Sequence, residues 1–283
     1  MNRGSGADMA DHEPRLCLTV PAEAANVALI RHALAGLAEG LGMDRAGIAD
    51  LKTVVTEACM NAVVHAYPEE PGPIEVEAWP SQEALELRVV DHGVGFQPRP
   101  DVESPGSSLR LGLSLVAALS DRFAIEGSSD GGTAVTMVLP LHGSGEIPQL
   151  REQGEVDAAP AEVSISASAA ELLPGVLSRA VSAFALRRDL TIDQVADAIL
   201  LAETVSESSG EAFGEELPSF ALADGEGGIE MTVGPLARGG GERLREGLVL
   251  PEDSGTVETL ADKVEIDRRP EGEFVVFAIA AGD

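Results

Sequence analysis

The first part of the chain shows two spacings of hydrophobic residues, one typical of a strand and one typical of a helix. Leu16 to Val20 alternate apolar and polar positions as in a half-buried strand, and Pro21 ends this strand before an alanine-rich helical stretch from Glu23 to about Leu41. A second predicted helix begins near Asp44. Its apolar residues recur every three or four positions and form one buried stripe: Ile48, Leu51, Val54, Val55, Ala58 and Ala62.

The pattern then changes back to strands. Residues Ile74–Ala78 and Ala84–Val90 predict a hairpin, Leu113–Ser120 a helix, and Phe123–Ile125 and Ala134–Leu139 two closing strands. The order strand-helix-helix-strand-strand-helix-strand-strand is typical of an α+β fold. We therefore expect a two-layer α/β sandwich, with helices on one face of a mixed or antiparallel sheet.

The second half of the chain repeats this pattern. A shift of 147 residues pairs apolar positions in order, among them Leu16 with Val163, Leu18 with Ile165, Ile30 with Leu177 and Val54 with Leu201. Shifts of 141 and 140 continue the match near the end, for example Ile125 with Ile266 and Met137 with Phe277. One such pair can arise by chance, but their order and nearly constant offset predict a tandem duplication.

A segment without apolar periodicity separates the two copies. Residues 143–162 are rich in glycine, proline and charge, which is typical of a linker. We therefore expect one domain over 13–142, a linker over 143–162 and a second domain over 163–283.

Charge narrows the classes of function. The 283 residues carry 19 Lys and Arg against 48 Asp and Glu, a net charge of −29. Such a surface repels nucleic acid and anionic lipid, so we expect neither as a direct partner. Cys17 and Cys59 are the two cysteines, which argues against a disulfide-built fold. With no basic, apolar leader and no apolar run of about 18 residues, the expected location is the cytoplasm.

Polar residues on the second predicted helix are the first candidates for chemistry. Glu57, Asn61 and His65 are spaced four apart, so they lie along one helical face and can converge on one ligand. Asparagine is a poor helix former, so its presence inside a predicted helix indicates a functional role for Asn61. His65 alone is more often an ordinary core or surface histidine.

Glycine-containing segments supply the other candidates. Asp91 follows a buried strand and is the first residue of the segment Asp-His-Gly-Val-Gly. Burying a carboxylate there costs free energy unless the carboxylate accepts a hydrogen bond. Leu111–Leu115 opens a predicted helix whose free N–H groups can receive phosphate, and Gly131-Gly132-Thr133 enters the last strand. The Asp-x-Gly-x-Gly run alone also fits a hairpin turn. Together and in this order, the segments are far more specific.

These segments resemble the GHKL ATPases, the superfamily of the Bergerat fold. EACMNAVVHAY (57–67) is similar to the N box, VVDHGVGF (89–96) to the G1 box, LGLSL (111–115) to the G2 box, and GGT (131–133) to the final glycine-threonine element. The HAYP ending and a short lid of about sixteen residues between Gly95 and Gly112 most resemble the RsbW-type anti-sigma-factor serine/threonine kinases. The resemblance covers residues 15 to 140.

The resemblance implies roles on the adenine and metal side. Asn61 would coordinate the Mg²⁺ that bridges the phosphates of ATP, and Asp91 would accept the adenine amino group. Gly93 and Gly95 would shape the adenine side, and Thr133 would support adenine through its hydroxyl.

It also implies roles on the phosphate side. The amides of Gly112 and Leu113 would hold phosphate, and Glu57 would be the general base toward a protein serine or threonine. His65 has a family-typical position and counts among the nucleotide-binding candidates. Arg110 stands where the G2 box usually has an earlier glycine, so it either contacts phosphate or stiffens the lid and weakens nucleotide binding.

The second copy lacks these residues. At the shift of 147, Glu57, Asn61 and His65 meet Thr204, Ser208 and Ala212, and a one-residue slip offers Glu203, Glu207 and Glu211 instead. No Lys-Ser/Thr follows Gly239-Gly240-Gly241, so a flexible surface loop is expected there. We expect one nucleotide per chain, with the degenerate copy completing an intramolecular pseudo-dimer; a true homodimer is the alternative.

Two functions remain open from the sequence. The first is an ATP- and Mg²⁺-dependent anti-sigma-type kinase that phosphorylates a STAS-type antagonist, with a sigma factor as second partner. The alternative is a non-catalytic ATP-binding adaptor in a partner-switching pathway. In that case the bound nucleotide only holds the lid in a partner-binding state, and the second copy offers a docking surface.

Overall fold

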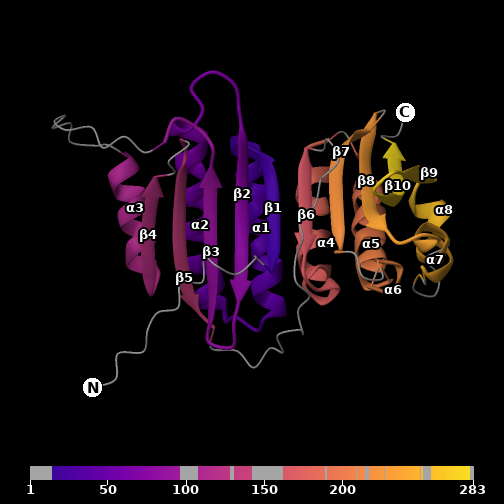
Figure 1. Ribbon diagram of the computed structural model, residues 1–283, viewed down its shortest axis with the longest axis horizontal. Helices are drawn as coiled ribbons and strands as arrows, with labels where there is room; N and C mark the ends of the chain where they lie inside the picture. Colours follow the sequence, from indigo (N-terminus) through magenta and orange to yellow (C-terminus); the bar gives the residue numbers. More distant parts are fainter. Residues whose placement is uncertain are drawn as a thin grey trace.

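Ten strands form one antiparallel sheet in the computed structural model. The structure describes residues 15–95, 108–127, 131–141, 162–188, 190–208, 210–213, 217–225, 227–248, 250 and 256–280. The strand order is β4-β5-β3-β2-β1-β6-β7-β8-β10-β9, and each neighbouring pair is antiparallel. Figure 1 shows the sheet running across the whole molecule, with the N-terminal half at one end and the C-terminal half at the other.

The first half contains the predicted elements in the predicted order. They are β1 (Leu16–Pro21), α1 (Ala24–Gly40), α2 (Arg45–His65), β2 (Pro73–Pro80), β3 (Ala84–Asp91), α3 (Ser108–Leu119), β4 (Arg122–Gly127) and β5 (Thr133–Pro140). The side chain of Asp44 accepts a hydrogen bond from the N–H of Gly47 at 2.8 Å and so caps α2. The α+β fold is confirmed. The third helix, however, begins five residues before the predicted Leu113.

The second half follows a similar order with additional short helices. Its elements are β6 (Val163–Ala167), the 3-10 helix η2 (Ala170–Leu172), α4 (Pro174–Ala185), α5 (Ile192–Ser208), α6 (Gly210–Phe213), β7 (Ser219–Gly225), β8 (Gly228–Leu236), α7 (Gly240–Gly247), α8 (Val257–Leu260), β9 (Lys263–Arg269) and β10 (Gly272–Ala280). From the centre outwards, β6-β7-β8-β10-β9 mirrors β1-β2-β3-β5-β4.

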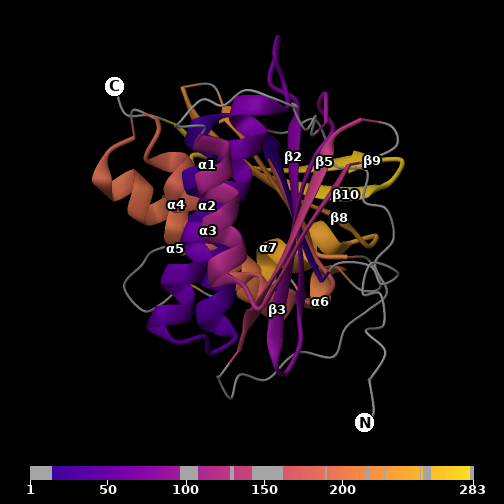
Figure 2. The ribbon, with the colours of Figure 1, turned by 90° about the vertical axis from the view of Figure 1, so that its left-hand side faces the viewer.

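Alternation along the strands explains the two layers. In β1 the side chains of Leu16, Leu18 and Val20 are buried, whereas those between them are only half-buried. The buried side of the sheet is covered by helices, and Figure 2 shows α1 to α5 on this one side. A fully buried leucine contributes about 1.5–3 kcal/mol relative to an exposed one, so the period of two fixes which face turns to the helices.

The two halves are joined through β1 and β6 at the middle of the sheet. Their register pairs Leu16 with Ala167 and Leu18 with Ile165. Behind these strands α1 crosses α4 where Gly36 and Gly175 bring the two backbones into contact, since a Cβ at Gly36 would collide with the Gly175 carbonyl. The halves therefore share both a sheet and a helical layer.

Polar contacts tie the same junction. The guanidinium of Arg179 on α4 pairs with Glu39 on α1. Arg187 donates to the side-chain oxygen of Asn26 at 2.7 Å, and Asn26 is fully buried. Of the predicted linker, Glu162 lies within the described residues and pairs with Arg188, whereas 143–161 lie outside them.

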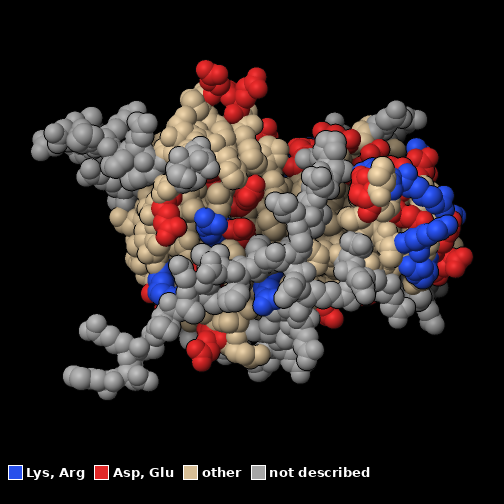
Figure 3. Space-filling view, in the orientation of Figure 1, with Lys and Arg blue, Asp and Glu red and all other residues tan. Residues whose placement is uncertain are grey.

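Charge is distributed unevenly over the surface. Figure 3 shows acidic side chains over both halves and basic side chains gathered at the β9 end. Several of these basic groups are already paired, as Arg268 with Glu273 and Arg269 with Asp267. In the described part of the chain, no helix combines the length and the apolar character needed to cross a membrane.

Candidate functional site

Helix α2 presents the three polar residues that the sequence singles out. Glu57 and Asn61 are half-buried and His65 is exposed at the last turn. The Nδ2 atom of Asn61 is buried and has no hydrogen-bond partner among the described residues. An unsatisfied buried polar group costs about 1–3 kcal/mol, so a ligand that accepts a hydrogen bond from this amide would recover that cost.

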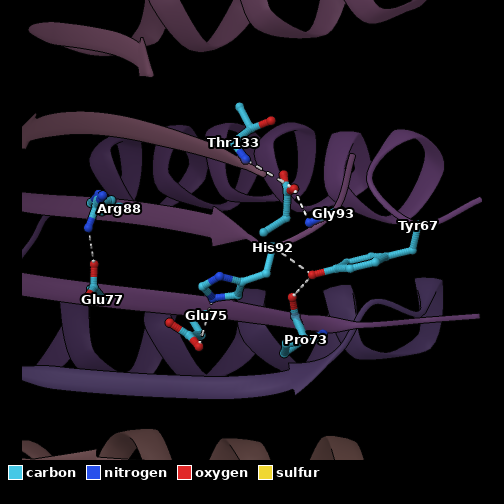
Figure 4. Close-up of polar contacts among 9 residues, drawn as sticks. Tyr67, Pro73, Glu75, Glu77, Arg88, His92, Gly93 and Thr133 are labelled. Carbon is cyan, nitrogen blue, oxygen red and sulfur yellow. Dashed lines mark hydrogen bonds and ion pairs between the residues drawn. The ribbon is translucent and has the colours of Figure 1, made fainter. Parts of the chain in front are cut away.

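Asp91 ends β3 and is the buried carboxylate of the site. It is 7% exposed, and its Oδ1 accepts hydrogen bonds from the N–H of Gly93 at 3.1 Å and of Thr133 at 3.2 Å. Figure 4 labels the two donor residues, Gly93 and Thr133, and draws both hydrogen bonds as dashed lines. Burial raises the pKa of Asp91, and the N–H groups of Gly93 and Thr133, the Thr133 hydroxyl and the nearby His92 lower it in part. A carboxylate has about four acceptor positions, so it retains capacity for a further donor.

Two glycines let backbone segments meet beside Asp91. A Cβ at Gly93 would collide with the carbonyl of Ala66, just after α2, and the Val94 N–H donates to this carbonyl at 2.9 Å. Gly132 has a φ of +93°, and its Cβ would collide with the Asp91 carbonyl. The end of α2, the turn after β3 and the start of β5 are therefore in direct contact.

The phosphate-side candidates meet on α2 and α3. Gly112 is buried, and a Cβ there would meet the carboxylate of Glu57, so the Glu57 side chain lies directly against α3. Leu113 is half-buried. Because α3 begins at Ser108, the free amides of the helix belong to residues 108–110. The predicted start at Leu113 would have put Gly112 next to the free amides, but Gly112 lies inside the helix. Arg110 lies in α3, but its side chain is outside the described residues.

The structure thus brings most predicted site residues into two groups. One contains Asp91, Gly93, Gly95 and Thr133, because Gly95 with a φ of +76° lies beside the backbone of Gly132, which precedes Thr133. The other contains Glu57 and Gly112. Asn61 lies on α2 one turn from Glu57 and one turn from the end that touches Gly93. The side chain of His65 is exposed at the end of α2.

A magnesium ion fits the donor set. Among the described residues no three His, Cys, Asp or Glu side chains gather around a possible metal position. Mg²⁺, however, takes oxygen ligands and is usually held by one or two protein groups together with water and substrate phosphates. The free amide of Asn61 can present its oxygen after rotation of the amide group, so it fits a metal that is held mainly through phosphates.

The corresponding place in the second half contains a different arrangement. Glu273, which the shift of 140 pairs with Thr133, is 8% exposed and accepts a hydrogen bond from the N–H of Gly241 at 3.1 Å. The N–H groups of Gly239 and Gly241 lower the pKa of Glu273, and Arg268 adds to this effect. Its carboxylate therefore binds the N-terminus of α7.

The expectation of a flexible loop at Gly239-Gly240-Gly241 is therefore wrong. Gly240 and Gly241 are buried first residues of α7, and Gly239 is its N-cap with a φ of +74°. A Cβ at Gly240 would approach Ala212, and one at Gly241 would approach Ile266. These glycines permit close packing.

The sequence pattern predicts no role for Tyr67, although this residue lies within the segment that resembles the N box. Its hydroxyl donates to the Pro73 carbonyl at 2.6 Å and accepts from the His92 N–H at 2.8 Å. A signal was available, because Tyr67 is the single tyrosine of a chain with 3% aromatic residues. The pattern alone did not show which strands it connects.

Fold and site together define a histidine kinase-like ATPase domain. A family model with this description matches residues 20–139. The chain is 32% identical over 163 residues to proteins named serine-protein kinase RsbW from Bacillus cereus (strain Q1) and Bacillus thuringiensis (strain Al Hakam), and the match covers 54% of this chain and 96% of each relative. The chain therefore belongs to the RsbW family of GHKL-type proteins, which confirms the resemblance.

Proposed function

We propose that the first half of the chain binds Mg·ATP and transfers its γ-phosphoryl group to a serine or threonine of a STAS-type anti-sigma antagonist. The observation that carries this proposal is the Asp91 carboxylate, which is buried and oriented by the N–H groups of Gly93 and Thr133. The free amide of Asn61 on the adjoining helix supports it. A sigma factor is the second partner in this proposal.

Nucleotide binding divides between the two groups of residues. Asp91 accepts the adenine amino group, because its carboxylate has free acceptor capacity and guanine would present a carbonyl oxygen instead. Gly93 and Gly95 shape the adenine side, because they let the turn after β3 approach the backbones of Ala66 and Gly132, and Thr133 supports the ring through its hydroxyl. Asn61 holds Mg²⁺.

Phosphate contacts belong to α3. Gly112 lies against the Glu57 carboxylate, and the free amides of the first turn, 108–110, are the phosphate donors in place of the amides of Gly112 and Leu113. Arg110 stays a candidate for phosphate contact, and His65 stays a candidate for nucleotide binding.

Glu57 acts as the general base. The substrate hydroxyl gives its proton to the Glu57 carboxylate as its oxygen bonds to the γ-phosphorus. The bond from that phosphorus to the β,γ-bridging oxygen breaks, and ADP leaves. Mg²⁺, when bound, neutralises charge on the phosphate oxygens. The half-buried position of Glu57, with its carboxylate against Gly112 of α3, supports this role.

The second half, in this proposal, is a degenerate tandem copy that takes the place of a homodimer partner. The mirrored strand order and the β1–β6 junction support this role. The Glu273 carboxylate on the N-terminus of α7 supports the absence of a second nucleotide site. One ATP per chain is expected.

A phosphotransfer assay with Glu57→Gln tests the proposal. Purified protein and labelled ATP are mixed with STAS-type proteins encoded by neighbouring genes. Glu57→Gln should bind ATP almost as the wild type does but transfer phosphate about 10²–10⁴-fold more slowly, because only the base is lost. Glu203→Gln on the exposed side of α5 is the matched control and should transfer normally.

Two outcomes would contradict this assignment. Full activity of Glu57→Gln would give the role of base to another residue. Wild-type protein that binds ATP but phosphorylates none of the antagonists would favour the adaptor function.

A further inference from the structure

Tyr67 lies between the end of α2 and the ends of two strands. It follows α2 by two residues and its ring packs flat against Gly72, where a Cβ would collide with the ring. Its hydroxyl donates to the carbonyl of Pro73 on β2 and accepts from the N–H of His92, which follows β3. Figure 4 shows the hydroxyl between these two backbone groups. Burial raises the pKa of Tyr67, so the hydroxyl keeps its proton at neutral pH and can donate.

The Tyr67 hydroxyl takes the place of a direct hydrogen bond between the ends of β2 and β3. The β2–β3 register ends with Ile74 opposite Asp91, so the next pair would be Pro73 and His92. Instead of bonding directly, the Pro73 carbonyl and the His92 N–H each bond to Tyr67. The two strands therefore separate at this point, and β3 turns away with Asp91 as its last residue.

Further contacts hold the same turn. The Val94 N–H donates to the carbonyl of Ala66, the residue before Tyr67. On the other face of the sheet the His92 Nε2 lies 3.1 Å from a carboxylate oxygen of Glu75. The segment 66–67 thus contacts the backbone directly after Asp91 at two points, and the end of α2 and the Asp91 turn are linked.

We propose that the Tyr67 hydroxyl is a positioning group that orients the Asp91 carboxylate for the adenine amino group. The His92 N–H belongs to the peptide that joins Asp91 to His92, so the bond to Tyr67 fixes this peptide plane. Without the hydroxyl, the N–H and the Pro73 carbonyl would both lose their partner, and the peptide would rotate to find others. This inference rests on the proposed nucleotide site and adds a determinant of its selectivity.

Titration of Tyr67→Phe with two nucleotides tests the inference. One is ATP, and the other is purine riboside triphosphate, which lacks the 6-amino group. Tyr67→Phe should weaken ATP binding about 3–10-fold, the equivalent of one neutral hydrogen bond. Binding of the purine nucleotide should change by less than about 2-fold, because Asp91 has no amino group to accept there. Thr204→Val removes a hydroxyl that bonds to the Leu200 carbonyl at 2.8 Å in the second half, and should change neither affinity.

A double-mutant cycle separates positioning from simple loss of structure. In an Asp91→Asn background, Tyr67→Phe should have no further effect on ATP binding, since both substitutions act through the same contact. Equal weakening of both nucleotides, or unchanged ATP affinity, would overturn the positioning role while leaving the nucleotide site in place. Wild-type protein that binds both nucleotides equally would overturn the Asp91 assignment itself, and this inference with it.

Discussion

Each half of the molecule contains a buried carboxylate at one end of an interior strand, Asp91 at the end of β3 and Glu273 near the start of β10. The two carboxylates are satisfied differently. Asp91 in the first half has its pKa raised, because burial outweighs its two N–H donors. Glu273 in the second half has its pKa lowered by the N–H groups of Gly239 and Gly241 and by Arg268. A buried carboxylate whose charge is incompletely compensated gains from a ligand donor, whereas a saturated one stabilises the fold alone.

The long central helices differ in the same way. On α2 the Asn61 amide has a buried nitrogen without a partner among the described residues. On α5 the hydroxyl of Thr204, the counterpart of Glu57 at the shift of 147, donates to the carbonyl of Leu200 on its own helix. The Thr204 hydroxyl is thus satisfied within its own helix, whereas the Asn61 nitrogen has no partner among the described residues.

Removal of the Asn61 amide should have the largest effect. Asn61→Ala should weaken ATP binding in Mg²⁺ by about 100-fold or more, beyond the roughly 10–100-fold typical of residues that only support a metal ligand. Ser208→Ala, at the matching position of α5, should leave ATP binding unchanged. Calorimetry measures both affinity and stoichiometry. Two ATP molecules per wild-type chain, or equal losses in the two variants, would contradict the division between the halves.

The junction between the halves gives the next largest effect. A Cβ at Gly36 meets the Gly175 backbone, so Gly36→Ala should lower the free energy of unfolding by about 1–3 kcal/mol. Gly40→Ala on the same helix has no atom within 4 Å of the added Cβ and should be neutral or stabilise by up to about 1 kcal/mol. Urea denaturation measures both. Equal effects would mean that the α1–α4 crossing does not hold the halves together.

Local patterns predicted most of the first half. Leu16, Leu18 and Val20 alternate because one face of β1 is buried, and Asp44 starts α2 because its side chain caps the free amides. Such features depend on neighbours a few residues away. The start of α3 was predicted five residues late.

Long-range partners could not be predicted in the same way. The β1–β6 pairing joins residues almost 150 positions apart, and nothing in β1 itself indicates which edge receives another strand. The glycines at the start of α7 were expected in a loop because their partner, Glu273, lies 32 residues beyond Gly241. Tyr67 is similar, since its role depends on where β2 and β3 separate.

The smallest expected effect concerns the carboxylate that caps α7. Glu273→Gln should lower stability at neutral pH by about 1 kcal/mol, because a charged acceptor is replaced by a neutral one at the Gly241 N–H and the ion pair with Arg268 is lost. The folded-state pKa of Glu273 lies below its ordinary value of 4.5, so its contribution is present above that pH and disappears as the pH falls through the folded-state pKa.

Thermal unfolding between pH 7 and pH 3 measures this contribution. The difference in Tm between the wild type and Glu273→Gln should shrink as the pH falls below about 4.5. Glu265→Gln removes an exposed carboxylate that pairs with Lys263 on β9, and should give a small difference with little pH dependence. A Tm difference for Glu273→Gln that stays constant over this range would mean that the Glu273 charge does not hold α7. The contrast with Asp91 would then lose its electrostatic basis.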